Sequence, residues 1–311
     1  IVRTIGAASE RFSEDYLRMI RAVRFAVRLG FDIEPATAAG IRKLAGRIIS
    51  ISGERIFDEL TKMLARPSAA DALEKLHELN LAGEIMPEMF QHPAVWPAAI
   101  SRVRRVAGRK DVVLTLAALT AELAVKDIVA MLRRWGASNE LRNSLTWMAE
   151  HLDDWKTAGA QLITVSHVAR PPSGVKSIKD AQPGAAVPHK ASGTQPGAAV
   201  PHEMSLADFK RLLANADFNR LMRLWRLRET DDSGSQCFVR RISRRIKTIS
   251  PKLISPPPFV SGDDLKQLGL SQGRQLGEIL RAIYDTQLNE ELSDKPAAMA
   301  AARRMINDCA K

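Results

Sequence analysis

The chain has 311 residues with 46 Lys or Arg against 35 Asp or Glu, which gives a formal net charge of +11. Two cysteines exclude a disulfide framework, and the six histidines lack the spacing of metal ligands. No apolar run is long enough to span a bilayer, so we expect a cytoplasmic protein that does not contact a membrane. A basic protein with only 5% aromatic residues is suited to a structured RNA, bound through its phosphates and its shape.

The first predicted helix, at residues 14–29, has an apolar face and a basic face. Ser13 is a good N-cap, and Glu14 and Asp15 suit the positive end of the helix dipole. We expect the helix to bury one arc of its surface, formed by Met19, Ile20, Val23, Ala26 and Val27. The opposite arc is basic and contains Arg18, Arg21, Arg24 and Arg28.

The acids at the start of this helix form, with Arg18, a pattern that can read a nucleobase. Glu14 lies four residues and Asp15 three residues before Arg18, so both carboxylates can reach its guanidinium group. A carboxylate such as that of Asp15 accepts from the amino group of cytosine or adenine, while the guanidinium group donates to the neighbouring base acceptors. Guanine and uracil present a carbonyl where the acid needs a donor. Spacing alone favours the other interpretation, an ordinary ion pair on a solvated helix face.

Apolar residues at helical spacing predict the other elements of the first half, whereas strand-like alternation is almost absent. The predicted helices lie at 37–49, 53–65, 68–79, 95–106, 112–123, 126–135 and 139–155. We therefore expect an all-α fold, an elongated array of packed helical hairpins. Residues 163–204 are different, because they repeat QPGAAVPH within a segment rich in Pro, Gly, Ala and Ser. Such a segment has no hydrophobic face to bury, so we expect a disordered linker there.

Two rows of arginines follow the linker. A predicted amphipathic helix at 205–228 carries Arg220, Arg223 and Arg226. A second predicted helix carries Arg240, Arg241, Arg244 and Arg245. Charge rows are usually solvated faces, but two in succession on a basic chain favour contact with RNA phosphates.

Three segments near the start resemble the neck of class II tRNA nucleotidyltransferases, the CCA-adding enzymes, and of the related bacterial poly(A) polymerases. They are RTIG at 3–6, ERFSEDYLRMIRAVRFAVRLGFDIEP at 10–35 and ISGERIFDELTKML at 51–64. Residues 256–292 resemble the tail of many CCA-adding enzymes. The resemblance implies an enzyme of this class that handles CTP, ATP and an RNA 3′ end.

The resemblance also implies roles for particular residues. The template that selects CTP and then ATP would consist of Glu14, Asp15 and Arg18, and Arg21 would contact the triphosphate. A second set would support the helices around the nucleotide, namely Arg55, Glu59 and Lys62. The spacing of this second set also suits a plain charge network within one helix.

The catalytic half of such an enzyme is expected outside this sequence. The family holds magnesium with an Asp-x-Asp motif in a head domain upstream of the neck, and the chain starts at Ile1, where that domain would end. The acidic pairs at 153–154, 231–232 and 263–264 lack the one-residue gap that puts two carboxylates on the same side of a strand. We therefore expect no catalytic or metal-binding residue here, an inactive chain when alone, and magnesium in the head domain.

These inferences divide the chain into a nucleotide-selecting neck (1–66), a helical body (67–162), the linker (163–204) and a basic, tRNA-binding tail (205–311). The expected function is addition of CMP and AMP, from CTP and ATP, to the 3′ end of tRNA. A bacterial poly(A) polymerase acting on another RNA 3′ end is the first alternative. The second is a stand-alone helical RNA-binding protein without catalysis. No protein partner is evident from the sequence.

Overall fold

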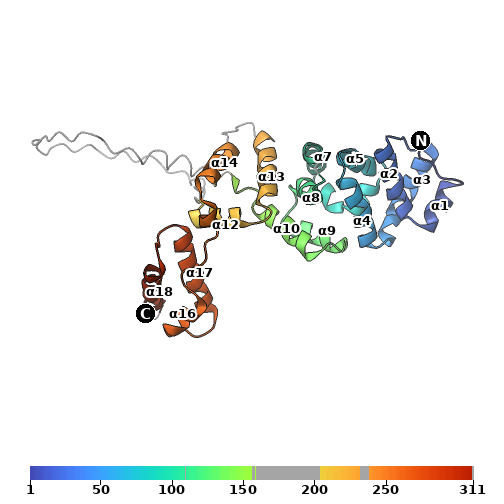
Figure 1. Ribbon diagram of the computed structural model, residues 1–311. Coiled ribbons are helices and arrows are strands. Elements are labelled where there is room, and N and C mark those ends of the chain that lie inside the picture. Colours follow the sequence, from blue (N-terminus) through green and yellow to red (C-terminus); the bar gives the residue numbers. More distant parts are fainter. Residues whose placement is uncertain (109, 156–157, 159–203, 232–237, 310–311) are drawn as a thin grey trace, which may run out of the picture. The chain divides into compact units, whose positions relative to one another are not determined.

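The computed structural model describes residues 1–108, 110–155, 158, 204–231 and 238–309 (Figure 1). Within these residues every regular element is a helix, apart from an isolated parallel bridge between Val2 and Ile33, so the all-α prediction is confirmed. The predicted linker lies outside the described residues except for its last residue. Contacts divide the chain into a first unit, Ile1–Asp153 with Ala216–Ser233, and a second unit, Asp154–Asn215 with Gly234–Lys311.

The first unit begins with two helices, α1 (Ala8–Glu14) and α2 (Leu17–Leu29), where one helix was predicted. Asp15 between them has an extended backbone (φ −158°, ψ 105°), so the predicted start at 14 is wrong. Ser13 is not an N-cap, because it lies within α1 and its hydroxyl donates to the Ser9 carbonyl (2.7 Å). The Asp15 carboxylate instead accepts the N–H of Leu17 (3.1 Å) and satisfies an amide at the start of α2.

The remaining helices of the first unit are α3 (Pro35–Leu44), η1 (Ala45–Ser50), α4 (Gly53–Leu64), α5 (Ala69–Glu78), α6 (Leu81–Ile85), η2 (Pro87–Phe90), α7 (Val95–Val106), α8 (Val112–Thr120), α9 (Val125–Arg134), α10 (Asn139–Glu150) and α13 (Phe218–Asp231). Five of them, α4, α5, α7, α8 and α9, lie within three residues of their predicted bounds, whereas α6 and η2 were not predicted. The prediction at 37–49 is divided because the chain tightens into a 3₁₀ helix at Ala45. The prediction at 139–155 is too long, because α10 ends at Glu150.

The core of the first unit forms where α2 packs against α4 and α5. Four of the five residues predicted on the buried face of α2 are at most 1% exposed, namely Met19, Ile20, Val23 and Ala26. Val27 is only half-buried because it lines a cavity beside α4. The amphipathic pattern of α2 thus decides which face meets the core.

The second unit contains α12 (Leu206–Ala214), α14 (Phe238–Thr248), α15 (Pro251–Ile254), α16 (Gly262–Gln267), α17 (Arg274–Leu288) and α18 (Lys295–Cys309). The single helix predicted at 205–228 is wrong. It ends where Asn215 takes an extended backbone (φ −74°, ψ 135°), and the carbonyl of Asp217 then accepts the first amides of α13. Because α12 packs in the second unit and α13 in the first, the range predicted as the tail is shared between them.

Asp264 connects two helices of the second unit. Its carboxylate accepts from Lys295 Nζ at the start of α18 (2.8 Å) and, in a capping box, from the amide (2.8 Å) and hydroxyl (2.7 Å) of Ser261. The Lys295 hydrogen bond first, and those of Ser261 next, hold the pKa of Asp264 well below its ordinary value. Ser261 is therefore the N-cap of α16.

The lowered pKa of Asp264 predicts a loss of stability in acid. A carboxyl whose folded-state pKa is below its unfolded value stabilises the fold above about pH 4, and this contribution is lost as the pH falls toward the folded pKa. We expect the protection of the α16–α18 amides, measured relative to their intrinsic exchange rates, to fall between about pH 4 and about pH 2, and Asp264→Asn to reduce that fall. Asp263→Asn, which removes an exposed partner of Lys266, is the control. The same acid dependence in wild type and Asp264→Asn would contradict the prediction.

Candidate functional site

The residues predicted to read a base lie where α1 ends and α2 begins. The Glu14 carboxylate accepts hydrogen bonds from Arg11 Nη1 (2.6 Å) and from Arg18 Nη1. The Arg18 hydrogen bond is the main cause that lowers the pKa of Glu14. Arg18 Nη1 also donates to the Arg11 carbonyl (3.0 Å). Its Nε and Nη2 have no partner among the residues that the structure describes, so one edge of the guanidinium group is held and the other is available.

Asp15 does not bond to Arg18, contrary to the expectation from spacing. Its Oδ2 accepts from Arg55 Nη2 on α4 (2.9 Å), and its Oδ1 accepts the N–H of Leu17 (3.1 Å). The helical spacing argument fails because Asp15 is outside both helices. The backbones of Asp15 and Arg18 are nevertheless in contact, since the Asp15 carbonyl accepts the Arg18 amide (3.0 Å). At the start of α2 the Asp15 carboxylate is thus held by Arg55 and the Arg18 guanidinium group by Glu14.

The predicted supporting residues lie on α4, and two of them bond to residues outside that helix. Besides Arg55, Glu59 accepts through Oε2 from Arg24 Nε on α2 (2.6 Å), and these two side chains are only 5% and 13% exposed. Lys62 stays within its helix, with Nζ 2.5 Å from Asp58 Oδ2 and 3.4 Å from Glu59 Oε1. The hydrogen bond to Asp58 raises the pKa of Lys62. Of the three supporting residues, only Lys62 therefore has all of its ion pairs within its own helix, as the alternative interpretation expected.

The sequence did not predict the position of Arg24. It belongs to the predicted basic row, but its guanidinium group is nearly buried against Glu59, 35 residues away in the chain. Arg21, one turn before it, is exposed and has no ion-pair partner in the described part of the chain. Of the two, only Arg21 has its charge available for a ligand in solution.

The arginines on α13 are less available for contact with RNA than the sequence suggests. Arg220 Nε lies 3.1 Å from both carboxylate oxygens of Asp111, and its Nη1 lies 2.5 Å from Asp217 Oδ1. Burial alone would lower the pKa of Arg220, but its hydrogen bonds to Asp217 and Asp111 raise it. Arg223 is half-buried and Arg226 is exposed, and neither has a carboxylate partner among the described residues. Arg220 thus joins α13 to the start of α8.

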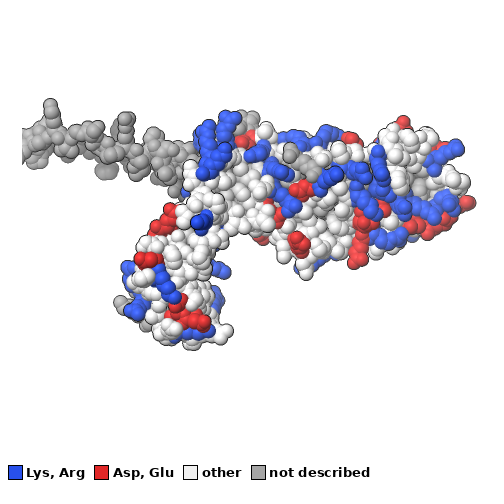
Figure 2. Space-filling model, in the orientation of Figure 1, with Lys and Arg blue, Asp and Glu red and all other residues white. Residues whose placement is uncertain are grey.

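The arginine row on α14 is divided into two pairs. Arg240 and Arg244 are exposed, and Figure 2 shows Lys and Arg side chains gathered over this helix. Arg241 and Arg245 are half-buried, with guanidinium carbons 5.6 Å from the ring centre of Phe238 and 5.1 Å from that of Phe209. Burial lowers the pKa of Arg245. Each half-buried guanidinium group has one buried nitrogen without a hydrogen-bond partner in the described residues.

Neither a metal cluster nor a membrane helix is found in the described residues. No group of three or more His, Cys, Asp or Glu side chains there could hold a metal ion. None of the described helices combines the length and the apolar character needed to cross a bilayer.

The fold is that of the helical part of nucleotide-adding enzymes. A crystal structure of the Bacillus stearothermophilus CCA-adding enzyme with CTP covers 99% of this chain at a TM-score of 0.58 and 22% identity, over 67% of its own length. A structure of a CCA-adding enzyme with ATP covers 98% of this chain at a TM-score of 0.53 and 16% identity, over 62% of its length.

Sequence comparison finds relatives for about half of the chain. Residues 30–92 match the family described as "Probable RNA and SrmB- binding site of polymerase A". The CCA-adding enzyme of Geobacillus kaustophilus is 36% identical over 154 residues, half of this chain and 37% of that enzyme. That of Geobacillus stearothermophilus is 34% identical over 171 residues, 55% of this chain and 38% of that enzyme. About half of the chain is thus similar to CCA-adding enzymes, and it spans less than two fifths of these two relatives.

Proposed function

We propose that this chain is the neck, body and tail of a tRNA nucleotidyltransferase that adds CMP and AMP, from CTP and ATP, to the 3′ end of tRNA. The observation that carries the proposal is that Asp15 and Arg18, both at the start of α2, are each held by another side chain, Asp15 by Arg55 and Arg18 by Glu14. This arrangement occurs in a chain that is 36% identical to a CCA-adding enzyme over 154 residues. We keep the proposed division into neck (1–66), body (67–162), linker (163–204) and tail (205–311).

Base selection would use the groups that internal bonds leave available. Arg18 donates through Nε and Nη2 to the ring acceptors of cytosine or adenine, while the Asp15 carboxylate accepts from the amino group. Glu14 and Arg55 already hold these two side chains, so little side-chain entropy is lost when a nucleotide binds. Uracil and guanine would set a carbonyl against the carboxylate, which is repulsive. Arg21, exposed one turn further along α2, would contact the triphosphate.

The residues on α4 would act through the helices that they hold. Arg55 fixes the carboxylate of Asp15, and Glu59 fixes Arg24 on α2. Lys62 would contribute by holding Asp58 and Glu59. Because both interhelical bonds meet the α1–α2 region, a shift of α4 would change the position of the template residues. We therefore assign these residues to positioning rather than to ligand contact.

RNA contact would come from the basic helices of both units. The exposed and half-buried arginines without carboxylate partners among the described residues are the proposed phosphate contacts, namely Arg223, Arg226, Arg240, Arg241, Arg244 and Arg245. Arg220 would position α13, because its two carboxylate partners already balance its charge.

Magnesium belongs to this chemistry, since in nucleotidyl transfer it supports the triphosphate and the attacking hydroxyl. The described carboxylates form no group that fits the ion. The residues of this chain are therefore assigned nucleotide selection and RNA binding, and none is assigned a catalytic step.

The product formed on tRNA tests the proposal. We expect the protein encoded by the complete reading frame to add two C residues and one A to a tRNA that lacks its CCA end, and then to stop. The added nucleotides are read on a sequencing gel with CTP and ATP together and with each alone. Long A tails formed with ATP alone would identify a poly(A) polymerase. RNA binding without any addition would favour the non-catalytic alternative.

A further inference from the structure

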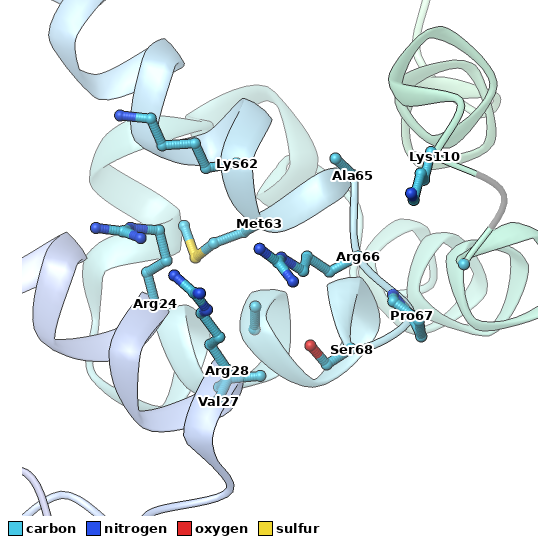
Figure 3. Close-up of a pocket in the computed structure, with 12 residues that line it drawn as sticks. Arg24, Val27, Arg28, Lys62, Met63, Ala65, Arg66, Pro67, Ser68 and Lys110 are labelled. Carbon is cyan, nitrogen blue, oxygen red and sulfur yellow. The ribbon is translucent and has the colours of Figure 1, made fainter.

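A cavity of about 590 Å³ in the first unit is lined largely by cations (Figure 3). It lies beside α2, between the end of α4 and the start of α5, with the loop after α7 at its rim. Its cationic side chains are Arg24, Arg28, Lys62, Arg66 and Lys110, and no Asp or Glu is among its lining residues. Its apolar lining includes Val27, Met63 and Pro67. None of the proposed base-reading residues, Glu14, Asp15 and Arg18, lines this cavity, so it is not the base-reading site.

Three of these five cations are not neutralised. Arg24 and Lys62 bond to acids of α4, Glu59 and Asp58, which do not line the cavity. By contrast, no carboxylate among the described residues pairs with the other three, which are Arg28, Arg66 and Lys110. Figure 3 shows the guanidinium groups of Arg28 and Arg66 on the same side of the cavity, below Met63. Like charges brought together without a counter-charge repel, so this arrangement favours an anion between them.

Two further residues, Ser68 and Lys110, distinguish the rim of this cavity. Ser68 is the N-cap residue of the ten-residue helix α5 and lines the cavity, but its side chain makes no capping hydrogen bond. The positive end of the α5 dipole and a free hydroxyl are thus available to an anion. Lys110 has a left-handed backbone (φ 56°), which is uncommon for a residue other than glycine. Such conformations concentrate at functional sites.

The chemistry and size of the cavity fit a phosphate that is part of a larger molecule. Guanidinium groups bind phosphate through two parallel hydrogen bonds, which a lysine cannot supply. A volume of about 590 Å³ is far larger than one phosphate needs, and the apolar wall offers a surface for a sugar. Arg28 follows Arg21 by seven residues, about 10 Å along the axis of α2. That distance corresponds to about three stacked nucleotides.

We propose that this cavity binds a backbone phosphate of the substrate RNA close to its 3′ end, with Arg28 and Arg66 as the principal donors and Lys110 as a third cation. The inference rests on the proposed function, because it requires an RNA whose 3′ end lies near Arg18 and Arg21. It adds a contact that fixes the strand a few nucleotides before the growing end. The base-selecting residues alone would hold only the incoming nucleotide.

The test is RNA binding by the double variant Arg28→Gln, Arg66→Gln in the full 311-residue chain. The probe is a labelled hairpin with the acceptor stem of tRNA and a single-stranded 3′ end, titrated by fluorescence anisotropy at several KCl concentrations. We expect binding to weaken about tenfold at about 0.1 M salt, and the slope of log K against log salt to become shallower by about 0.7 to 1. Both residues are exposed, so the fold should be retained, which circular dichroism would verify.

A matched control removes two exposed arginines of the same unit that do not line the cavity, Arg47→Gln with Arg133→Gln. We expect it to weaken binding less than about threefold, since those charges act only at long range. A blunt hairpin without the single-stranded end should bind wild type and the Arg28, Arg66 variant equally. Binding of ATP and CTP should also be unchanged in the variant.

Several results would overturn the assignment. If wild type binds the hairpin and the Arg28, Arg66 variant binds it equally well, the cavity does not hold the strand. Equal losses in both double variants would indicate general charge attraction instead. Weaker ATP or CTP binding with unchanged RNA binding would make the anion a nucleotide triphosphate. Failure of wild type to bind the hairpin would count against the proposed function itself, and so is distinguishable from failure of this site.

Discussion

Replacing Arg18 by alanine should remove most of the preference for CTP and ATP over UTP and GTP. The available edge of this guanidinium group is the proposed donor to the ring acceptors, and Glu14 holds its other edge. A pair of hydrogen bonds to one base edge contributes about 1–3 kcal/mol of discrimination, so we expect a loss of about 10- to 100-fold. The measurement is the ratio of kcat/KM values for the four nucleotides in the protein from the complete reading frame.

Arg11 supplies the control for this prediction. Like Arg18, it donates to the Glu14 carboxylate and lies on the exposed surface, but it belongs to α1. Arg11→Ala therefore removes an ion pair of the same kind without removing the proposed base contact. We expect it to keep the nucleotide preference. Asp15→Ala should lose the preference as Arg18→Ala does, and unchanged nucleotide choice in both of these variants would refute the template assignment.

Gly53→Ala should destabilise the first unit severely. A Cβ atom at Gly53 would lie 1.8 Å from the carbonyl oxygen of Arg134 and 3.0 Å from the Cα of Trp135, and both are backbone atoms that a rotamer change cannot move away. We expect a loss of about 3 kcal/mol in the free energy of unfolding, the upper end of the usual cost of overpacking. Urea unfolding can be followed by the fluorescence of Trp135, which is 1% exposed and stacks on Phe57 of α4.

A second glycine separates this effect from the general consequences of a Gly→Ala change. Gly83 lies in α6, is exposed, and has no atom within 4 Å of the position that a Cβ would take. Gly83→Ala should therefore be neutral or stabilising by up to about 1 kcal/mol, as expected for a helical position. An unchanged urea midpoint for Gly53→Ala would contradict the prediction. It would show that α4 and the end of α9 leave room for the added Cβ atom, which the 1.8 Å distance to the Arg134 carbonyl oxygen excludes.

The Gly53 contact also bears on function. The same helix carries Arg55 and Glu59, which bond to Asp15 and Arg24. If α4 is displaced from α9, these bonds lengthen and the template residues lose their support. Reduced nucleotide discrimination in Gly53→Ala would thus arise without any change in a residue that contacts the nucleotide.

The spacing of apolar residues predicted most helix positions correctly, because a helix that buries one face repeats apolar residues at helical spacing. α7 spans 95–106 as predicted, and α4 differs from its prediction by one residue. The predictions failed where the backbone becomes extended although the helical pattern continues. Asp15 interrupts the first helix, and the extended Asn215 ends α12 within an amphipathic pattern that continues through it.

The sequence by itself determined the all-α class, the basic character and the set of residues proposed to read a base, because these depend on composition and on neighbours a few positions apart. Only the tertiary structure decided how those residues are held. Asp15 bonds to Arg55 at a separation of 40 residues and Arg24 to Glu59 at 35, and helix packing selects such partners. The cationic cavity arises in the same way, since Arg28, Arg66 and Lys110 are brought together by the packing of helices that are distant in sequence.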